Sequence, residues 1–357
     1  MCSWGLVGGL GLGVNLPCDN PGRNTVSRSG WMAAMPVSRT PAPITPTTTL
    51  AEIGEFGLIR ALTDRFPQGP NVLIGPGDDA ALVEVPDGRV VVSTDLCVDT
   101  RHFRRDWATA QDIGHRVAAQ NLSDINAMGG KATALTIGLA APSDLLAQWA
   151  LDLADGIAEE AGLLDASVVG GDLTGSDQVM ISVTVLGVVE GEPVLRSGAR
   201  PADVLALAGR QGWAAAGLAV LTRGFRSPRA VVEAYRRPEP PYAAGAQALG
   251  QGATAMIDIS DGLVADVAHL AEASGVGIDI ESAAFDPAEP LRAVGAALGT
   301  DPLGFVLGGG DDHSLVATFP ANVALPTGWT QIGSVAAGEG VTVDGAGYPG
   351  VAGHAHF

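Results

Sequence analysis

The sequence predicts an α+β protein with two domains, and three observations support this fold class. At about 150 residues per domain, the 357 residues are enough for two domains that each bury a core. Short strand-like runs alternate with helical patterns along the chain. Gly191, Pro193 and Gly198 then interrupt the pattern, which restarts near Val204. We therefore expect one domain at 50–192 and an α/β domain at 193–357.

Residues 1–49 show no sustained period, and 35–50 is a run rich in Pro and Thr with the composition of a linker. We expect this leader to be disordered. Folded pattern begins at residue 50, where Ile53, Phe56 and Ile59 start an apolar stripe at helical spacing that continues to residue 66.

The remaining elements of the first domain follow from periodicity and turn residues. Ser143 is expected to cap a helix that ends at Gly162, and its apolar face includes Leu153 and Ile157. Strands are predicted at 72–74, 81–85, 90–94, 132–140 and 179–189, with a further helix at 108–128.

The second domain is also mixed. Its predicted strands are 204–208, 256–259, 277–280 and 314–319, and its predicted helices are 214–221 and 263–273. No fixed-period repeat relates the two domains.

Composition excludes several classes of protein. Lys and Arg total 20 against 39 Asp and Glu, which gives a net charge of −19 and disfavours binding of nucleic acid or of anionic membranes. No apolar run is long enough to span a bilayer, and the first 16 residues lack the basic start of a signal peptide. The three cysteines have no metal-finger spacing. We expect a cytoplasmic protein.

The informative feature is a set of aspartates beside Gly or small residues, which we expect at strand ends. The set comprises Gly75-Pro-Gly-Asp78-Asp79, Ser93-Thr94-Asp95, Asn121-Leu-Ser-Asp124, Gly170-Gly171-Asp172, Asp258-Ile-Ser260-Asp261-Gly262 and Gly308-Gly-Gly-Asp311-Asp312. Each alone is ordinary turn chemistry.

Together these aspartates indicate a cation site. Asp95 and Asp258 follow strands that are apolar enough to be buried. Like charges about 4 Å apart repel by roughly 4 kcal/mol at an effective dielectric of about 20, so such a cluster needs cations. Carboxylate and hydroxyl oxygens suit Mg²⁺, which takes its remaining ligands from water and phosphates. Several bound ions would let this acidic chain accept a polyphosphate.

Common nucleotide motifs are excluded. Lys131 is the only lysine and no GxxxxGK[ST] occurs, so a P-loop is ruled out. The GxGxxG match at 345–350 contains Pro349 and leaves too few residues for a Rossmann helix.

The chain resembles the thiamine-monophosphate kinases, within the aminoimidazole ribonucleotide synthetase superfamily. The resemblance runs from about Gly54 to the C-terminus. It rests on Gly54-Glu-Phe-Gly-Leu-Ile59, Ile74-Gly-Pro-Gly-Asp-Asp79, Ser93-Thr-Asp95 with His102-Phe103, Asn121-Leu-Ser-Asp-Ile-Asn-Ala-Met-Gly129, Gly170-Gly-Asp172, Arg196-Ser-Gly198 and Asp258-Ile-Ser-Asp-Gly-Leu263.

The resemblance implies a two-domain PurM-like fold, in which the N-terminal domains of a homodimer join into a β-barrel and an α/β domain covers the nucleotide. It implies transfer of the γ-phosphoryl group of ATP to thiamine monophosphate, with several Mg²⁺ ions and no general base, because the acceptor phosphate is already ionised near pH 7. The implied magnesium ligands are Asp78, Ser93, Thr94, Asp95, Asp124, Asp172, Asp258 and Asp261. The implied ATP contacts are Gly171, Asp172, Arg196 and Ser260, and the implied thiamine contacts are His102 and Asp311.

Two positions depart from the family pattern. The usual Gly-Gly-Glu-Asp-Tyr is here Gly309-Gly310-Asp311-Asp312-His313, and the aromatic residue expected after Gly near the C-terminus is here His354. Two alternatives remain at this point: another ATP-using member of the superfamily, such as aminoimidazole ribonucleotide synthetase, or a non-catalytic protein that binds divalent ions or nucleotides. A selenophosphate synthetase is disfavoured because no lysine accompanies Cys18.

Overall fold

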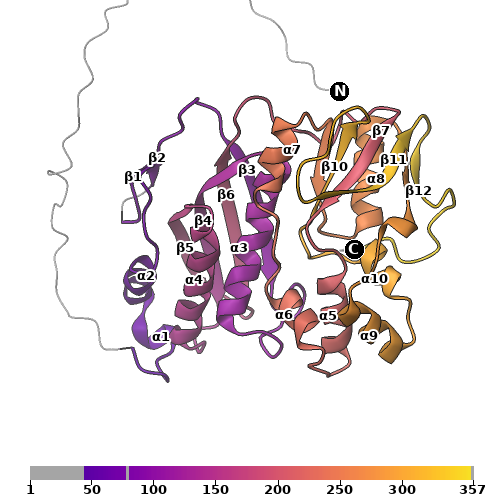
Figure 1. The fold of residues 1–357 in the computed structure, drawn as a ribbon. Coiled ribbons are helices and arrows are strands. Elements are labelled where there is room, and N and C mark those ends of the chain that lie inside the picture. Colours follow the sequence, from indigo (N-terminus) through magenta and orange to yellow (C-terminus); the bar gives the residue numbers. More distant parts are fainter. Residues whose placement is uncertain (1–43, 78–79, 355–357) are drawn as a thin grey trace, which may run out of the picture. The chain divides into compact units, whose positions relative to one another are not determined.

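A computed structural model describes residues 44–77 and 80–354, all within one compact unit, Ala42–Phe357 (Figure 1). Most of the predicted leader lies outside the described residues. Among those that are described, Thr49 caps the first helix: its side chain accepts from the backbone N–H of Glu52, whose carboxylate accepts from the N–H of Thr49. The first helix, Leu50–Ile53, therefore begins at the predicted residue, with its cap one residue earlier.

The first half contains a four-stranded sheet of order β3-β6-β4-β5 and a two-stranded ribbon β1-β2. β4 and β5 are parallel, so the chain must cross back between them, and α4 makes this crossing. The bounds are α1 Leu50–Ile53, α2 Glu55–Thr63, β1 Val72–Ile74, β2 Leu82–Val83, β3 Val91–Val98, α3 Ala110–Ala127, β4 Lys131–Ala141, α4 Ala147–Gly162, β5 Ser167–Gly175 and β6 Met180–Val188.

The second half contains a six-stranded sheet of order β12-β9-β11-β7-β10-β8, in which only the β12–β9 pair is parallel. Its elements are β7 Asp203–Ala208, α5 Trp213–Thr222, α6 Arg229–Arg236, α7 Ala244–Gly250, β8 Ala255–Asp258, α8 Leu263–Ser274, β9 Gly277–Ile280, the 3-10 turn η1 Ser282–Ala284, α9 Glu289–Leu298, α10 Pro302–Gly308, β10 Leu315–Pro320, β11 Trp329–Ala336 and β12 Gly340–Val343. Mixed helix and strand content in both halves confirms the predicted α+β class.

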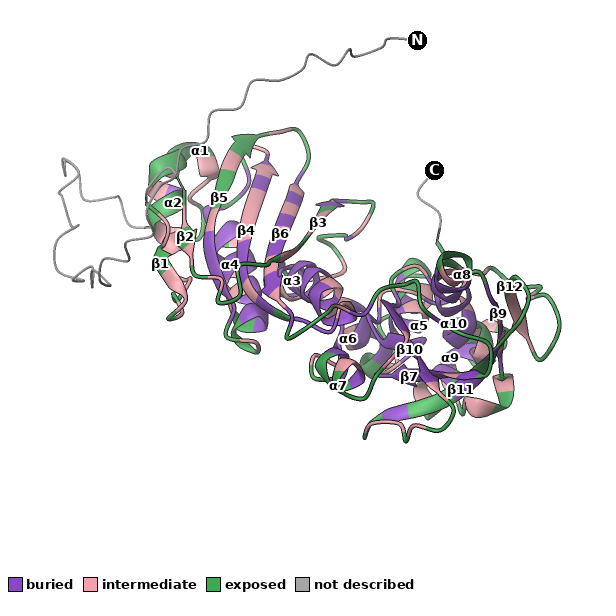
Figure 2. Ribbon diagram, turned by 90° about the horizontal axis from the view of Figure 1, so that it is seen from above, coloured by how far each residue is buried: buried purple, intermediate pink, exposed green. Residues whose placement is uncertain are grey.

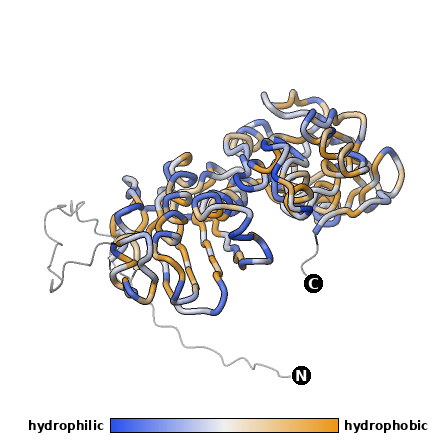
Figure 3. The backbone as a smooth tube through the Cα atoms, turned by 90° about the horizontal axis from the view of Figure 1, so that it is seen from below, coloured by the Kyte–Doolittle hydropathy of each residue, from blue (hydrophilic) through white to orange (hydrophobic). Residues whose placement is uncertain are grey.

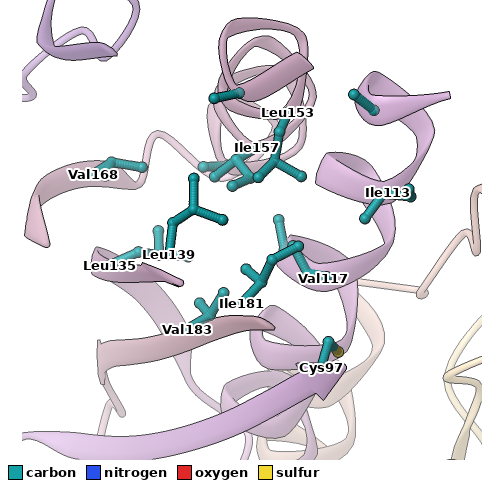
Figure 4. Close-up of a cluster of buried hydrophobic side chains, with 14 of the residues drawn as sticks. Cys97, Ile113, Val117, Leu135, Leu139, Leu153, Ile157, Val168, Ile181 and Val183 are labelled. Atoms are coloured by element: carbon teal, nitrogen blue, oxygen red, sulfur yellow. The ribbon is translucent and has the colours of Figure 1, made fainter. Parts of the chain in front are cut away.

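α3 and α4 pack on one face of the four-stranded sheet and bury it (Figure 2). Leu135, Leu153 and Ile181 are among the side chains that meet between the helices and the strands (Figure 4). The tube coloured by hydropathy shows the same pattern, with hydrophobic stretches inside the elements and hydrophilic connections between them (Figure 3). This core fixes the position of α3, which carries much of the site.

The other face of the four-stranded sheet is exposed in the single chain. On β3, residues alternate between the two faces, and Val92 and Leu96 keep 59% and 50% of their surface exposed. Exposed side chains of this size on a sheet face are typical of a surface that another element covers.

Three local predictions were wrong. The first helix is interrupted at Gly54, whose φ of +67° breaks it into α1 and α2, and Phe56 is 70% exposed while Leu58 is buried instead. Ser143 does not cap α4, which begins at Ala147 without a side-chain cap. Strand β5 was not predicted, because its glycines suggested a turn.

The aspartates are also placed differently from the expectation that they end strands. Asp95 lies in the middle of β3, Asp124 in the last turn of α3 and Asp172 within β5. Among the aspartates of this set that the structure describes, only Asp258 ends a strand, β8. Gly171 illustrates the difference: it lies within β5, where a Cβ would be 2.0 Å from the carbonyl oxygen of Ile137, so this glycine permits close strand packing and does not turn the chain.

Candidate active site

Helix α3 carries a polar stripe of four side chains spaced four residues apart: Asp112, Arg116, Gln120 and Asp124. This spacing keeps successive side chains on neighbouring turns of one side of a helix. The helix starts with a capping box in which the Thr109 hydroxyl accepts the backbone N–H of Asp112 and the Asp112 carboxylate accepts the backbone N–H of Thr109. The stripe therefore runs the length of a helix that is otherwise mostly buried.

Strand β3 presents two polar side chains to the last turns of α3. Ser93 donates to Asp124 Oδ2 at 2.6 Å, and Gln120 donates to Asp95 Oδ2 at 2.9 Å. Thr94 lies on the opposite face of β3, where its hydroxyl contacts Thr184. The period of two in a strand thus brings Ser93 and Asp95 together and directs the Thr94 side chain away.

Asp258 comes from the second half, at the end of β8. Its side chain is 6% exposed, and Oδ2 lies 3.0 Å from Ser123 Oγ of α3 and 3.2 Å from His313 Nδ1. Burial lowers the pKa of His313, but the hydrogen bond to Asp258 and the charges of Asp258 and Asp311 together outweigh it, and the net pKa is raised. The carboxylate therefore has a fixed orientation supported from both halves of the chain.

The loop after β8 is shaped by Asp266 of α8. One oxygen, Oδ2, accepts the backbone N–H groups of Ser260, Asp261 and Gly262, each at 3.0 Å. Burial raises the pKa of Asp266 to about 6 in spite of these bonds. Gly262 has a φ of +153°, and a Cβ there would lie 2.7 Å from the Ala352 carbonyl, so only glycine fits this loop.

A second loop, after α10, brings Asp311 to the same place. A Cβ on Gly310 would lie 2.0 Å from the carbonyl oxygen of Ser260, so the two loops can touch only through a glycine. Asp311 has a φ of +66°, and its N–H donates to that same carbonyl at 2.9 Å. Its carboxylate meets Arg116 Nη2 at 2.7 Å. Desolvation raises the pKa of Asp311, but the charge and hydrogen bond of Arg116, together with the charges of His313 and His354, outweigh it and the net pKa is lowered.

These elements surround a cavity of about 550 Å³. His102, predicted to contact the thiamine substrate, lies on its wall, and its Nδ1 accepts the backbone N–H of Val98 at 3.0 Å. His354 lies on the wall as well. The polar and charged lining comprises Asp95, Arg101, His102, Arg116, Gln120, Asp124, Tyr235, Asp258, Ser260, Asp261, Asp311, His313 and His354.

The carboxylates in this cavity repel one another. Burial, followed by the charge of Asp258, raises the pKa of Asp124 to about 7, and Asp95 contributes in the same direction. No cation from the protein is paired with Asp124 among the interactions of the described residues. The site is therefore arranged to receive positive charge from elsewhere.

The donor set fits Mg²⁺ with incomplete protein coordination. The available atoms are carboxylate and hydroxyl oxygens, the hard ligands that Mg²⁺ prefers. Within the part of the chain that the structure describes, no three His, Cys, Asp or Glu side chains form a ready metal cluster. An ion held here would therefore complete its shell with water and phosphate oxygens, as Mg²⁺ commonly does.

Several predicted site residues lie away from this cavity. Gly171 and Asp172 are exposed on β5, an edge strand of the four-stranded sheet, and Arg196 is exposed before β7. Asp78 lies outside the described residues. The structure brings together Asp95, Asp124, Asp258, Ser260, Asp261, Asp311 and His102, with Ser93 hydrogen-bonded to Asp124.

Four polar cavity residues were not predicted: Arg116, Gln120, Tyr235 and Arg101. The four-residue spacing of Arg116, Gln120 and Asp124 along one side of the predicted helix was a signal for the first two. Tyr235 had no such signal, because only the packing of α6 against α3 brings it to the cavity.

Comparison with known proteins identifies the class of this fold and site. Residues 77–189 match the N-terminal domain model of AIR synthase related proteins, and residues 200–322 match the C-terminal domain model. The fold is thus that of the AIR synthase related proteins.

Relatives narrow the class to one family. The chain is 49% identical to a thiamine-monophosphate kinase of Mycobacterium tuberculosis over 316 residues, which cover 88% of this chain and 94% of that protein. A Corynebacterium glutamicum thiamine-monophosphate kinase is 38% identical over 80% of this chain and 87% of that protein. The chain belongs to the thiamine-monophosphate kinase family.

Solved structures agree. Thiamine monophosphate kinase from Aquifex aeolicus superposes with a TM-score of 0.68 at 31% identity, covering 72% of this chain and 88% of that one. A complex of AaThiL with AMPPCP and TMP superposes with a TM-score of 0.72 at 33% identity, covering 88% of this chain and all of that one.

Proposed function

We propose that this protein transfers the γ-phosphoryl group of ATP to the phosphate of thiamine monophosphate and so makes thiamine diphosphate. The observation that carries the proposal is the cavity in which Asp95, Asp124, Asp258 and Asp261 converge while the pKa of Asp124 rises to about 7. Such a site can bind two anionic molecules only together with cations. The reaction follows from the membership of the chain in the thiamine-monophosphate kinase family. A related complex holds AMPPCP and TMP, which supports ATP as the phosphoryl donor.

We infer that Mg²⁺ is the cation, held by Asp95, Asp124, Asp258 and Asp261, with Ser93 beside Asp124. Of the other predicted ligands, Asp78 is outside the described residues, and Thr94 and Asp172 lie away from this cavity in the single chain. When bound, Mg²⁺ neutralises the negative charge of the phosphates that must approach one another. Hydrogen bonds from Gln120, Ser93 and Ser123 hold three of these carboxylates in place beforehand. This preorganisation avoids the cost of ordering them during the reaction.

The protein needs no general base for this reaction. The attacking atom is an oxygen of a phosphate that is ionised near pH 7, so no proton has to be removed from it. The task of the chain's own residues is to align the two phosphates in line and to exclude other acceptors. We assign an ATP contact to Ser260 and thiamine contacts to His102 and Asp311, all of which line the cavity. The family resemblance further implies ATP contacts at Gly171, Asp172 and Arg196, which lie away from this cavity in the single chain.

We propose that the protein works as a homodimer in the cytoplasm. The uncovered face of the four-stranded sheet, with Val92 and Leu96 exposed, supports a second copy closing this sheet into a barrel. Val92→Asp should yield a monomer by light scattering, whereas a dimer unaffected by this change would contradict the arrangement. Within the described part of the chain, no helix is long and apolar enough to cross a membrane.

The reaction is tested by incubating the purified protein with ATP, Mg²⁺ and thiamine monophosphate. We expect thiamine diphosphate and ADP in equal amounts. We expect no product when Mg²⁺ is left out, and none when thiamine monophosphate is left out. ADP release that depends on the substrate of aminoimidazole ribonucleotide synthetase instead would favour that alternative. Binding of nucleotide without any turnover would favour a non-catalytic protein.

A further inference from the structure

Arg116 is a nearly buried cation in the wall of the cavity, and the proposed function leaves it without a role. Its side chain is 8% exposed. One arm of the guanidinium, Nη1, donates to the carbonyl oxygen of Tyr235 at 2.5 Å, and the other, Nη2, meets Asp311 Oδ2 at 2.7 Å. The guanidinium carbon also lies 4.6 Å from the centre of the Tyr235 ring. Three independent contacts therefore fix its orientation.

Tyr235 is a suitable anchor for this arginine. It lies in the last turn of α6, Arg229–Arg236, where backbone carbonyls have no partner within the helix. A positive charge is favourable at a helix C-terminus, and the ring face adds a cation–π contact. The contacts with Tyr235 thus hold the Arg116 guanidinium so that Nη2 is directed at Asp311.

Asp311 is fixed at its backbone but depends on Arg116 at its side chain. Its left-handed backbone and its N–H bond to Ser260 set the position of the Cα atom. The Asp311 side chain is 45% exposed, and Arg116 forms an ion pair with its carboxylate, to which the nearby His313 and His354 add favourable charge. Without that arginine, the carboxylate would be free to change rotamer in the cavity.

We propose that Arg116 is the positioning residue that sets the thiamine-binding end of the cavity, because it holds the short Asp311 carboxylate where the substrate meets it. This inference deepens the proposed function and rests on it. The chain has aspartate where its family usually has glutamate, so the reach of this carboxylate is shorter by one methylene. The Arg116 guanidinium compensates for the shorter reach because its two nitrogens fix the direction of the Asp311 carboxylate. A lysine has a single ammonium group and cannot hold both contacts in this way.

A second arginine of the same region provides a matched control. Arg237 follows α6 and pairs with Asp112 on the first turn of α3, with Nε 2.5 Å from Oδ1. This ion pair joins the same two helices as Arg116 but does not line the cavity. A purely structural role for Arg116 would make its loss resemble the loss of Arg237.

The experiment measures steady-state kinetics with each substrate varied in turn, for wild type, Arg116→Met, Arg116→Lys, Asp311→Asn, the double variant Arg116→Met/Asp311→Asn, and Arg237→Met. We expect Arg116→Met and Asp311→Asn each to raise KM for thiamine monophosphate about tenfold or more, with KM for ATP within about twofold of wild type. Arg116→Lys should fall between wild type and Arg116→Met. The double variant should be no worse than the poorer single variant, because both changes break one interaction.

Arg237→Met should leave both KM values unchanged and lower only the melting temperature. Equal increases of both KM values in Arg116→Met, or effects that multiply in the double variant, would overturn the inference. If Arg116→Met does not fold, Asp311→Asn and Arg116→Lys decide it, since an unchanged KM for thiamine monophosphate in both also overturns it. Failure of the wild type to phosphorylate thiamine monophosphate would instead reject the proposed function itself.

Discussion

Asp112 and Asp124 lie on the same helix, the first in the opening turn of α3 and the second in its last turn, and both are largely buried. Asp112 is paired with a cation of the protein itself, Arg237. Burial raises its pKa, but the bonds from Arg237 and Thr109 outweigh this and lower it. Asp124 has a serine and further carboxylates as neighbours, and its pKa is raised to about 7.

The difference teaches how to separate structural from functional carboxylates in one helix. A structural carboxylate is neutralised by the fold itself, so it is satisfied as soon as the chain folds. A carboxylate reserved for binding is held in place by neutral hydrogen-bond donors while its charge remains uncompensated. Four tests can break or sharpen this contrast.

The largest effect is expected at the reactive end of the helix. Asp124→Asn should lower kcat more than about 100-fold, because the variant loses a carboxylate that holds a cation while keeping its shape. Its free energy of unfolding without Mg²⁺ should be unchanged or higher, since one repelling charge is gone. Asp95→Asn and Asp258→Asn should likewise abolish turnover with the fold largely intact.

Coupled assays of ADP release and urea unfolding measure both quantities, and Asp177→Asn, on an exposed residue, serves as the control. Near-normal activity of Asp124→Asn would show that its uncompensated charge has no part in the reaction.

The second test adds the missing charge. Mg²⁺ with a non-hydrolysable ATP analogue at about 100 times its Kd should stabilise the wild type by about 2.7 kcal/mol. Asp124→Asn should show little of this gain, whereas Asp112→Asn should keep it. Thermal melts with and without the ligands give the comparison, and equal gains in the two variants would remove the distinction between the ends of α3.

The third test removes the structural carboxylate. Asp112→Asn should lower the free energy of unfolding by about 1–3 kcal/mol, because it weakens the capping box and leaves Arg237 without its ion pair. KM and kcat measured at a temperature where the variant is folded should equal those of the wild type. A large loss of kcat without loss of stability would place Asp112 in the machinery of the reaction.

The smallest effect concerns pH at the structural end of the helix. Burial lowers the pKa of His115, but its bonds to Glu160 and Glu159, at 2.9 and 2.8 Å, outweigh this and raise the pKa. The stability contributed by these bonds is fully present below the unfolded value near 6.5 and is lost as pH rises through the folded pKa, by at most about 1.4 kcal/mol per pH unit.

The difference in unfolding free energy between wild type and His115→Gln, followed from pH 5 to 9, isolates this contribution. A difference that does not shrink as pH rises would contradict the assignment.

Much of the local structure could be predicted because it depends on near neighbours. The helices at 108–128 and 263–273 and the strand at 179–189 follow from periodicity alone, and the structure confirms them within a few residues. β5 and the break at Gly54 were missed, since glycines that permit close packing look the same in a sequence as glycines that turn the chain.

The sequence predicted a cation site, but it identified only some of the residues that line the cavity. Aspartates beside small residues, in a chain of net charge −19, indicated a cation site, and Asp95, Asp124 and Asp258 do meet in one cavity. The sequence could not show that Thr94 faces away from the cavity. Alternation along a strand separates two faces, but only the elements packed against the strand show which face lies towards the cavity. It also could not show that Arg116 meets Asp311, 195 residues further along the chain.

The sequence by itself determined the α+β class and the family, and it indicated a cation site, because these inferences depend on residue types, local spacing and the excess of acidic groups. Only the tertiary structure decided which carboxylates are paired with a cation of the protein and which keep an uncompensated charge. That choice depends on contacts between α3 and elements more than a hundred residues away, namely Arg237 for Asp112 and Asp258 for Asp124. The pKa of a buried carboxylate is set by what packs against it, and packing across such separations is a property of the whole fold.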